Sequence, residues 1–329
     1  MLVSHRPIAV LLLADGTVFT GRSIGAKGIT VGEICFNTGM TGYQEIFTDP
    51  SYTGQIMTLA TAHVGNYGVK IGEEESDRIR IAGLVVKKFS EVWSRPGGTG
   101  SLDDLLKQQG VVGISDIDTR KLVRHIRDNG AQNALISSSE MDLTVLTKQL
   151  ANAPNMKGLE LSSVVSTREA YTVGDQNAPH RVALVDFGVK ANIVRCLVER
   201  GCQVRVFPMT ATMEEMLSFQ PHGFLLSNGP GDPGAMPTSV SLTTARSTVS
   251  PSILSRPIPA ATPTNVKRLL ATNRMAVELS DASLTSNVSL AGVYDASSVG
   301  IRRRSQLTLT PGTSDDSCSA PMRTPYENA

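Results

Sequence analysis

The pattern in residues 181–237 constrains the fold of this chain more than any other. VALVDFG, QVRVFP and GFLLSN are short, nearly continuous apolar runs, and the segments between them have the periodicity and stop signals of helices. Such runs are typical of strands that a parallel sheet buries on both faces, and their alternation with helices predicts a doubly wound sheet. Ligands of these sheets bind beyond the carboxyl ends of the strands. GPGDP at 229–233, directly after the third run, is therefore the candidate binding loop.

A mixture of strands and helices precedes this run. IAVLLLADGTVFTG predicts two strands joined by an Asp-Gly turn, and GEICFNTGMTGYQEIFTDPSYTGQIMTLA and IAGLVVKKF predict further strands and turns. Helices are expected later, where Ser101 begins LDDLLKQQG and where Asp118 begins TRKLVRHIRDNG, which stops at Gly130. We therefore expect an α/β protein with a mixed strand–helix domain over 1–150, a linker over 151–180 and an incomplete doubly wound domain over 181–237.

The pattern stops after about residue 237. No period of two or of 3.6 is sustained from there, Ser and Thr become frequent, and no histidine follows His222. A doubly wound sheet needs more than three strands, and these residues are poor candidates for them. We predict that residues 238–329 form a poorly ordered tail.

Bulk properties exclude several classes of protein. The chain of 329 residues has a net charge of +1 and no long run of one sign, so neither nucleic acid nor a membrane surface is expected as a partner. No stretch approaches the ~18–20 apolar residues of a membrane helix. The four cysteines form no CxxC pair, which excludes the usual zinc and disulfide patterns; they are Cys35, Cys196, Cys202 and Cys318. A cytoplasmic protein without a metal site is expected.

Several short segments of the sequence, taken together, resemble one family. FNTGMTGYQEIFTDPSYTGQI, VGNYG, GISDIDTRKLVRHIRDNGAQNA, VDFGVKANI and LLSNGPGDP resemble the small subunit of carbamoyl-phosphate synthetase over about residues 8–236. The resemblance implies an N-terminal domain peculiar to these subunits, followed by a class I glutamine amidotransferase domain. It also implies a heterodimer in which this subunit hydrolyses glutamine and passes ammonia to a large, ATP-using subunit. The product, carbamoyl phosphate, feeds arginine and pyrimidine synthesis; ATP and Mg²⁺ are expected on the large subunit, and no cofactor on this chain.

The resemblance also implies roles for three residues. Ser51, Gly229 and Gly231 would contact glutamine, and the N–H of Gly229 would be part of the oxyanion hole. Each has a structural alternative. Ser51 follows Asp49-Pro50 and would suit a turn or a cap, and the two glycines would suit a tight turn that needs a positive φ.

The catalytic residues of the class cannot be identified in this chain. Class I amidotransferases use a cysteine on a Gly-x-Cys-x-Gly elbow, a histidine base and an orienting glutamate. Where the elbow is expected after GPGDP, the sequence is SPSILSRPIPAAT, without a cysteine. The late Cys318 lies in DDSCSAP and has no glycine elbow. We therefore predict that the chain lacks glutaminase activity.

The remaining reactive side chains favour structural interpretations. Cys35, Cys196 and Cys202 suit packing positions, and His63 suits a structural or surface position. His125 belongs to a helix with a cationic face that is either solvated or in contact with a large subunit; the cations are Arg120, Lys121, Arg124 and Arg127. Two alternatives to an active subunit stay open: a non-catalytic module that binds the large subunit, and a defective product of an altered reading frame.

Overall fold

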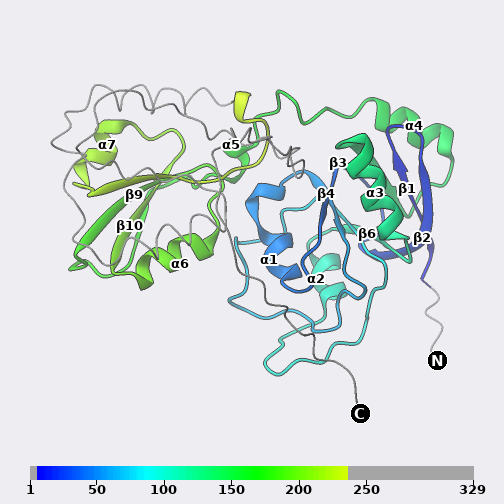
Figure 1. Ribbon diagram of the computed structural model, residues 1–329, viewed down its shortest axis with the longest axis horizontal. Coiled ribbons are helices and arrows are strands. Elements are labelled where there is room, and N and C mark those ends of the chain that lie inside the picture. The colour runs from blue at the N-terminus through cyan, green and yellow to red at the C-terminus, as the bar shows by residue number, and fades with distance from the viewer. Residues whose placement is uncertain (1–5, 236–329) are drawn as a thin grey trace, which may run out of the picture. The chain divides into compact units, whose positions relative to one another are not determined.

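The computed structural model describes residues 6–235 (Figure 1). The predicted tail over 238–329, with Cys318, lies outside these described residues. Between residues 6 and 235 no helix is long and apolar enough to cross a membrane.

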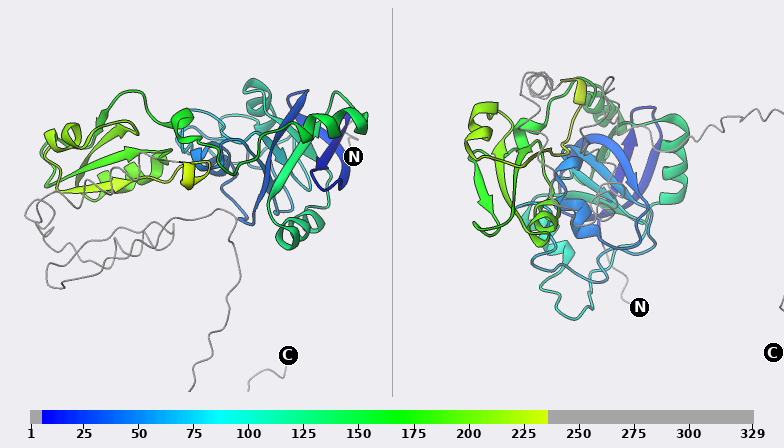
Figure 2. Two further views of the ribbon diagram at one scale, coloured as in Figure 1. Left: turned by 90° about the horizontal axis from the view of Figure 1, so that it is seen from above. Right: turned by 60° about the vertical axis from the view of Figure 1, so that its left-hand side comes forward.

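The N-terminal part forms a closed barrel (Figures 1 and 2), with the strand order β1-β2-β6-β5-β4-β3-β7. The pairs β6–β5, β5–β4 and β4–β3 are parallel and the others antiparallel. The predicted hairpin is confirmed, since Leu11 pairs with Phe19. The strands are β1 (Ile8–Leu13), β2 (Val18–Gly25), β3 (Ile29–Asn37), β4 (Gln55–Leu59), β5 (Gly83–Val85), β6 (Val112–Ser115) and β7 (Gln132–Ser137).

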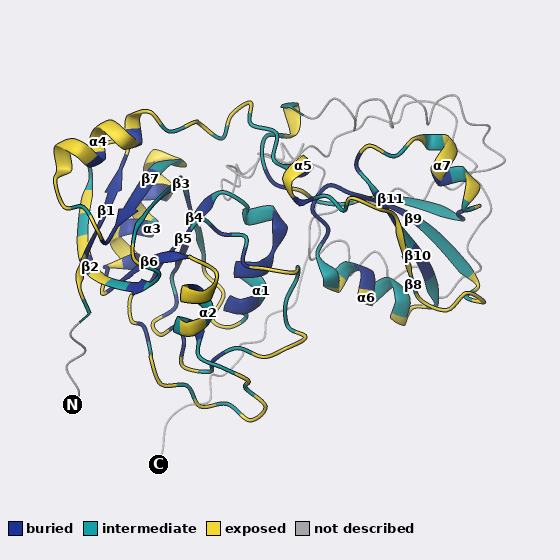
Figure 3. Ribbon diagram, turned by 180° about the vertical axis from the view of Figure 1, so that it is seen from behind, coloured by how far each residue is buried: buried dark blue, intermediate teal, exposed yellow. Residues whose placement is uncertain are grey.

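The barrel has one core inside and further cores under its helices. The inner cluster takes buried residues from every strand of the barrel except β2, whose partly buried Phe19 packs against it, and it includes Leu122 and Ile126 of a helix. Alternate residues of the same strands point outward: Val85 lies in the inner cluster, whereas Leu84 lies in an outer one. Because side chains alternate along a strand, one strand serves both layers. Figure 3 shows β1, β4, β5 and β6 largely buried, whereas β2 and β3 are mostly intermediate or exposed and the outer sides of the helices are exposed.

Two helices of the barrel domain begin where the sequence predicts. Ser101 Oγ accepts a hydrogen bond from the Asp103 N–H at 3.1 Å, and Asp118 Oδ1 accepts one from the Lys121 N–H at 3.0 Å. Both are N-caps of the expected kind. The helices of this domain are α1 (Tyr43–Thr48), α2 (Leu102–Gln108), α3 (Thr119–Asn129) and α4 (Leu143–Ala151).

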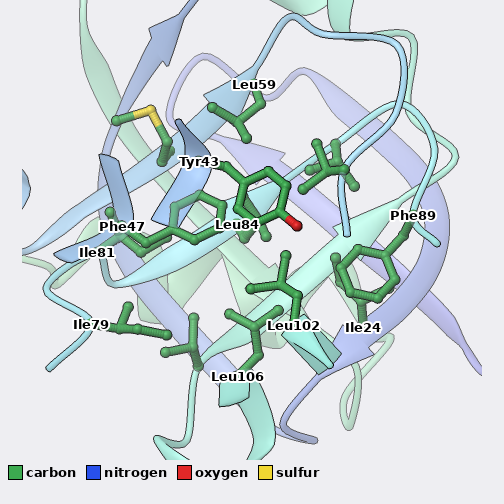
Figure 4. Packing of buried hydrophobic residues seen from close by; sticks show 14 residues of the cluster. Ile24, Tyr43, Phe47, Leu59, Ile79, Ile81, Leu84, Phe89, Leu102 and Leu106 are labelled. Carbon is green, nitrogen blue, oxygen red and sulfur yellow. The ribbon is translucent and has the colours of Figure 1, made fainter. Parts of the chain in front are cut away.

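Helix α1 corrects the expectation of strands and turns between residues 33 and 60. Tyr43 and Phe47 are one helical turn apart and both are buried in the outer cluster over β4 and β5 (Figure 4). The hydroxyl of Tyr67 accepts hydrogen bonds from the N–H groups of Gly42 and Tyr43, at 2.8 and 3.0 Å. A side chain from a later loop thus satisfies the start of α1, which explains why the local sequence does not reveal the helix.

The second sheet has the predicted βαβαβ course. Its order is β11-β9-β10-β8, with β11, β9 and β10 parallel. The α6 side of the sheet buries Leu184 and Val204, and the α7 side buries Ala183 and Phe207. The two helices therefore cover opposite faces, as in a doubly wound sheet. The elements are β8 (Tyr171–Val173), β9 (His180–Asp186), α6 (Ala191–Glu199), β10 (Cys202–Pro208), α7 (Met213–Ser218) and β11 (Gly223–Leu226).

The segment 151–180, predicted as a linker, also contributes structure. It contains the short helix α5 (Ser162–Val165) and the strand β8, which pairs antiparallel with β10. Only three residues of β8 join the sheet, and Tyr171 and Thr172 are exposed. A short, exposed edge strand has no apolar run that would mark it in the sequence.

We predict that the barrel domain folds by itself. A chain that ends at Leu150 keeps all seven strands and every helix of the barrel except the last residue of α4. It should therefore unfold cooperatively on heating, as small single domains usually do. Thermal unfolding followed by circular dichroism checks this. A broad transition without a midpoint would contradict it.

Acid should weaken one contact of the barrel rim. Asp15 accepts hydrogen bonds from the Thr17 N–H (2.9 Å) and Gln132 Nε2 (3.1 Å) and pairs with His125 Nε2 (2.5 Å). Burial alone would raise the pKa of Asp15, but these partners outweigh it and hold the pKa well below its usual range. A lowered pKa stabilises the fold above the pKa of the unfolded state, about 4, and this contribution is lost as the pH falls through the folded value.

The stability difference between wild type and Asp15→Asn should therefore be fully developed near pH 5 and should shrink as the pH falls below about 4. Urea unfolding at a series of pH values measures it. Asp128→Asn is the control, because Asp128 is an exposed carboxylate on α3 whose one ion pair within residues 6–235 is with the exposed Arg127. The same pH dependence in both variants would contradict the assignment to Asp15.

Candidate functional site

The candidate site lies where the connections of the second sheet change direction. β9 is central, α6 leads from it to β10 on one side, and α7 leads from β10 to β11 on the other. The loops 187–190 and 227–232 follow the carboxyl ends of β9 and β11. In open α/β sheets this is the place where ligands bind.

The buried carboxylate of Asp186 organises the end of β9. Asp186 Oδ1 accepts hydrogen bonds from the N–H groups of Gly188 (2.9 Å) and Val189 (2.8 Å), and Oδ2 accepts one from the Thr167 N–H (2.7 Å). A buried carboxylate is tolerated when backbone donors satisfy it. Asp186 thus fixes the loop 187–190 and ties residue 167 of the preceding segment to it.

The loop after β11 packs tightly against the loop after β9. Phe187 N donates to Ser227 Oγ at 2.9 Å, and a Cβ at Gly229 would lie 2.3 Å from the Phe187 carbonyl oxygen. Only glycine allows this approach. Gly229 itself is exposed, and within residues 6–235 no group accepts a hydrogen bond from its N–H. Among the described residues, this N–H therefore has no acceptor.

Two features of the backbone require a glycine at position 231. Its φ is +84°, and a Cβ there would lie 2.5 Å from the Leu159 carbonyl oxygen. The next residue, Asp232, donates its N–H to the same oxygen at 2.9 Å. The expectation of a positive φ thus holds for Gly231, whereas at Gly229 the requirement comes from close packing.

Ser51 lies beside this loop although it belongs to the barrel domain. It sits in a 3₁₀ turn (Pro50–Tyr52) whose cap is Asp49, which accepts a hydrogen bond from the Ser51 N–H at 2.9 Å. Ser51 Oγ in turn accepts a hydrogen bond from the side-chain amide of Asn228. The structure therefore brings Ser51 together with the neighbour of Gly229. The turn interpretation and the site interpretation of Ser51 are both compatible with this position.

An ion pair next to Ser51 has no counterpart in the sequence predictions. Lys190 Nζ lies 2.7 Å from Asp49 Oδ2, and the carboxylate is almost fully buried. Burial alone would lower the pKa of Lys190, but the charge and hydrogen bond of Asp49 outweigh it and raise the pKa. The pair joins the loop 187–190 to the turn that carries Ser51. Nothing in the sequence around either residue indicates the other.

Two of the described cysteines have thiols that are harder to ionise than usual. Burial, with a smaller effect of Glu33, raises the pKa of the Cys35 thiol to about 12, and burial also raises that of Cys202. Within residues 6–235 no hydrogen bond joins a cysteine to a histidine, the pairing that activates a thiolate.

The helix that the sequence predicts to have a cationic face is α3. Its four basic side chains are exposed, and His125 pairs with Asp15.

Comparison with known proteins first gives the class of the second sheet. Residues 183–254 match the family model of the class I glutamine amidotransferases. This match extends beyond residue 236, where the resemblance of the short sequence segments to the family ends. The doubly wound sheet, with the candidate loop after β11, is the part of this class that the structure describes.

The N-terminal domain gives the family itself. Residues 11–136 match the model of the carbamoyl-phosphate synthase small chain, CPSase domain. Curated relatives named carbamoyl phosphate synthase small chain include those of Vibrio cholerae (47% identical over 68% of this chain and 64% of the relative), Polynucleobacter necessarius (48%, 69% and 64%) and Chlorobaculum tepidum (46%, 69% and 62%). Over the matched part, the chain belongs to the carbamoyl-phosphate synthase small chain family. It spans a little under two thirds of the length of these relatives.

The packing of Gly229 leads to a stability prediction. Gly229→Ala places a methyl group against the Phe187 carbonyl and within 2.7 Å of Ser162 Oγ, so the loop after β11 has to move. Overpacking of this kind typically costs about 1–3 kcal/mol. Chemical denaturation of the full chain should show a loss of this size in the transition of the second sheet.

Gly223→Ala is the matched control for that experiment. Gly223 begins β11, and a Cβ there meets nothing within 4 Å. The control should be neutral within about 0.5 kcal/mol. Equal losses in the two variants would show that the contact with Phe187 is not the cause.

Proposed function

We propose that this chain supplies the barrel domain and one wall of the glutamine site of a carbamoyl-phosphate synthase small subunit. The observation that supports it most directly is the contact between Ser51 and Asn228, which brings a hydroxyl of the barrel domain to the residue that precedes the exposed Gly229. Polar groups from two domains thus converge at the carboxyl end of a doubly wound sheet. In this proposal Ser51, Gly229 and Gly231 contact the substrate glutamine.

The chemistry of the proposed reaction needs an oxyanion donor on this wall. Hydrolysis of the glutamine amide passes through a tetrahedral oxyanion, which preorganised backbone N–H groups stabilise. We assign this role to the Gly229 N–H. The released ammonia would pass to a large subunit that holds ATP and Mg²⁺ and makes carbamoyl phosphate for arginine and pyrimidine synthesis. The family of the relatives supports this assignment.

A second candidate is a non-catalytic module that binds the large subunit. Two observations favour it for this chain: the sequence after GPGDP has no Gly-x-Cys-x-Gly elbow, and the described cysteines Cys35 and Cys202 have raised pKa values. In this proposal the barrel domain docks on the large subunit, and ammonia comes from solution. A defective product of an altered reading frame is distinguished from both by the solubility and protease resistance of the purified chain.

We predict that this chain does not hydrolyse glutamine. Loss of the nucleophile or the base from a triad typically costs on the order of a millionfold in turnover, which an oxyanion donor does not restore. A complex with a large subunit should still make carbamoyl phosphate from added ammonium, because that path bypasses the cysteine. The measurement is ammonia release from glutamine beside carbamoyl phosphate formation from ammonium.

Cysteine variants control this experiment. Glutamine turnover that disappears in Cys318→Ala would place the nucleophile in the segment after residue 237. Turnover that disappears on substitution of Cys35, Cys196 or Cys202 would place it in the described part of the chain. Either result would contradict the prediction. If ammonium also fails as a substrate, the proposal that the chain supports a large subunit is wrong.

A further inference from the structure

The first turn of α6 is capped by a residue of the barrel domain. The first N–H groups of a helix have no partner within the helix, and the residue before α6, Lys190, has no acceptor in its side chain. Glu75 supplies both acceptors instead. Its carbonyl oxygen accepts a hydrogen bond from the Ala191 N–H, and its Oε2 accepts one from the Asn192 N–H, each at 2.9 Å. The negative carboxylate also suits the positive end of the helix dipole.

A second contact lies one turn further along the same helix. Arg195 Nη2 donates to the Glu74 carbonyl oxygen at 2.7 Å. Two consecutive residues of one loop thus receive three donors from α6. Glu74 and Glu75 belong to a segment between β4 and β5 of the barrel, whereas α6 belongs to the second sheet. Every one of these contacts therefore joins the two domains.

The acceptor loop is held firmly on α1. The Glu75 N–H donates to Thr48 Oγ1 at 2.9 Å, and Ser76 Oγ donates to the Thr48 carbonyl oxygen at 2.6 Å. The Glu74 carboxylate accepts hydrogen bonds from Gln44 Nε2 and the Gly72 N–H, at 3.0 and 2.7 Å. Thr48 and Gln44 are buried residues of α1. The cap is therefore anchored to buried residues of α1.

The cap lies between the two elements that support the candidate site, which are helix α1 and helix α6. Helix α1 ends one residue before Asp49, whose carboxylate holds the turn of Ser51. Helix α6 begins directly after the loop 187–190, whose Phe187 carbonyl packs against Gly229. Glu75 thus joins the element before Ser51 to the element after the loop that supports Gly229.

We propose that Glu75 is a positioning residue that caps α6 from the barrel domain and thereby holds the loop 187–190 in place relative to Ser51. The inference goes beyond the proposed function, because it concerns the orientation of two domains and needs no glutamine hydrolysis. Its test can therefore succeed or fail independently of the enzymatic assays.

The experiment compares Glu75→Ala and Glu75→Gln with wild type in the full chain, by hydrogen exchange of the first turn of α6. Loss of an N-cap typically corresponds to about a fivefold change in an opening equilibrium, so Glu75→Ala should exchange about fivefold faster there. Glu75→Gln keeps an acceptor oxygen without the charge, and it should show an intermediate increase. Trypsin should also cut faster at Lys157, an exposed residue between the two domains, in Glu75→Ala.

Glu214→Gln is the matched control. It removes an exposed carboxylate in the first turn of α7 of the same sheet domain, and the contacts of Glu74 and Glu75 with α6 are retained. Exchange in the first turn of α6 should be unchanged in this variant. The same increase in Glu214→Gln as in Glu75→Ala, or wild-type exchange in both Glu75 variants, would overturn the proposal. If Glu75→Ala loses protection throughout the barrel strands, Glu75→Gln decides: a wild-type rate in α6 overturns the proposal.

Discussion

The carboxylate of Asp186 is the interaction on which the arrangement of the second domain depends. It ends a strand that is buried on both faces, and three backbone N–H groups satisfy it. Since a buried carboxylate without such donors would cost several kcal/mol, the chain around it is held in one conformation. The loop 187–190 is fixed in this way. Its carbonyl and ammonium groups then reach Gly229 and the turn of Ser51.

The parts of the fold that could be predicted from the sequence are those that local chemistry determines. Ser101, Asp118 and Gly130 mark helix ends because caps involve residues two to four positions apart. The parallel run from β9 to β11 is visible because fully buried strands are continuously apolar. Closure of the barrel depends on pairing between distant strands, such as β1 with β7, and no local pattern indicates it. Helix α1 was missed because its first donors bind the hydroxyl of Tyr67.

The candidate site, like the fold, could be predicted from the sequence only in part. The loop that holds Gly229 and Gly231 can be selected from the sequence because it follows a buried strand, whereas the roles of these glycines and of Ser51 are implied by the family resemblance. The contacts between the domains could not be predicted from the sequence. They join ordinary surface-type residues that are far apart in the chain, Lys190 with Asp49 and Glu75 with Asn192. Their significance comes from the tertiary structure, which places an acidic loop at the start of a helix that lacks its own cap.

The packing of Gly229 and Gly231 has a consequence for the evolution of such chains. Each hydrogen faces a carbonyl oxygen of the protein itself, so a larger residue would disturb the fold whether or not a substrate ever binds. Selection for a folded domain alone is enough to retain both glycines. In a lineage in which the chemistry has been lost, this loop would stay intact long after residues that touch only the substrate had drifted. The presence of this loop therefore indicates that the domain folds, whereas the side chains around it are the better indicators of catalysis.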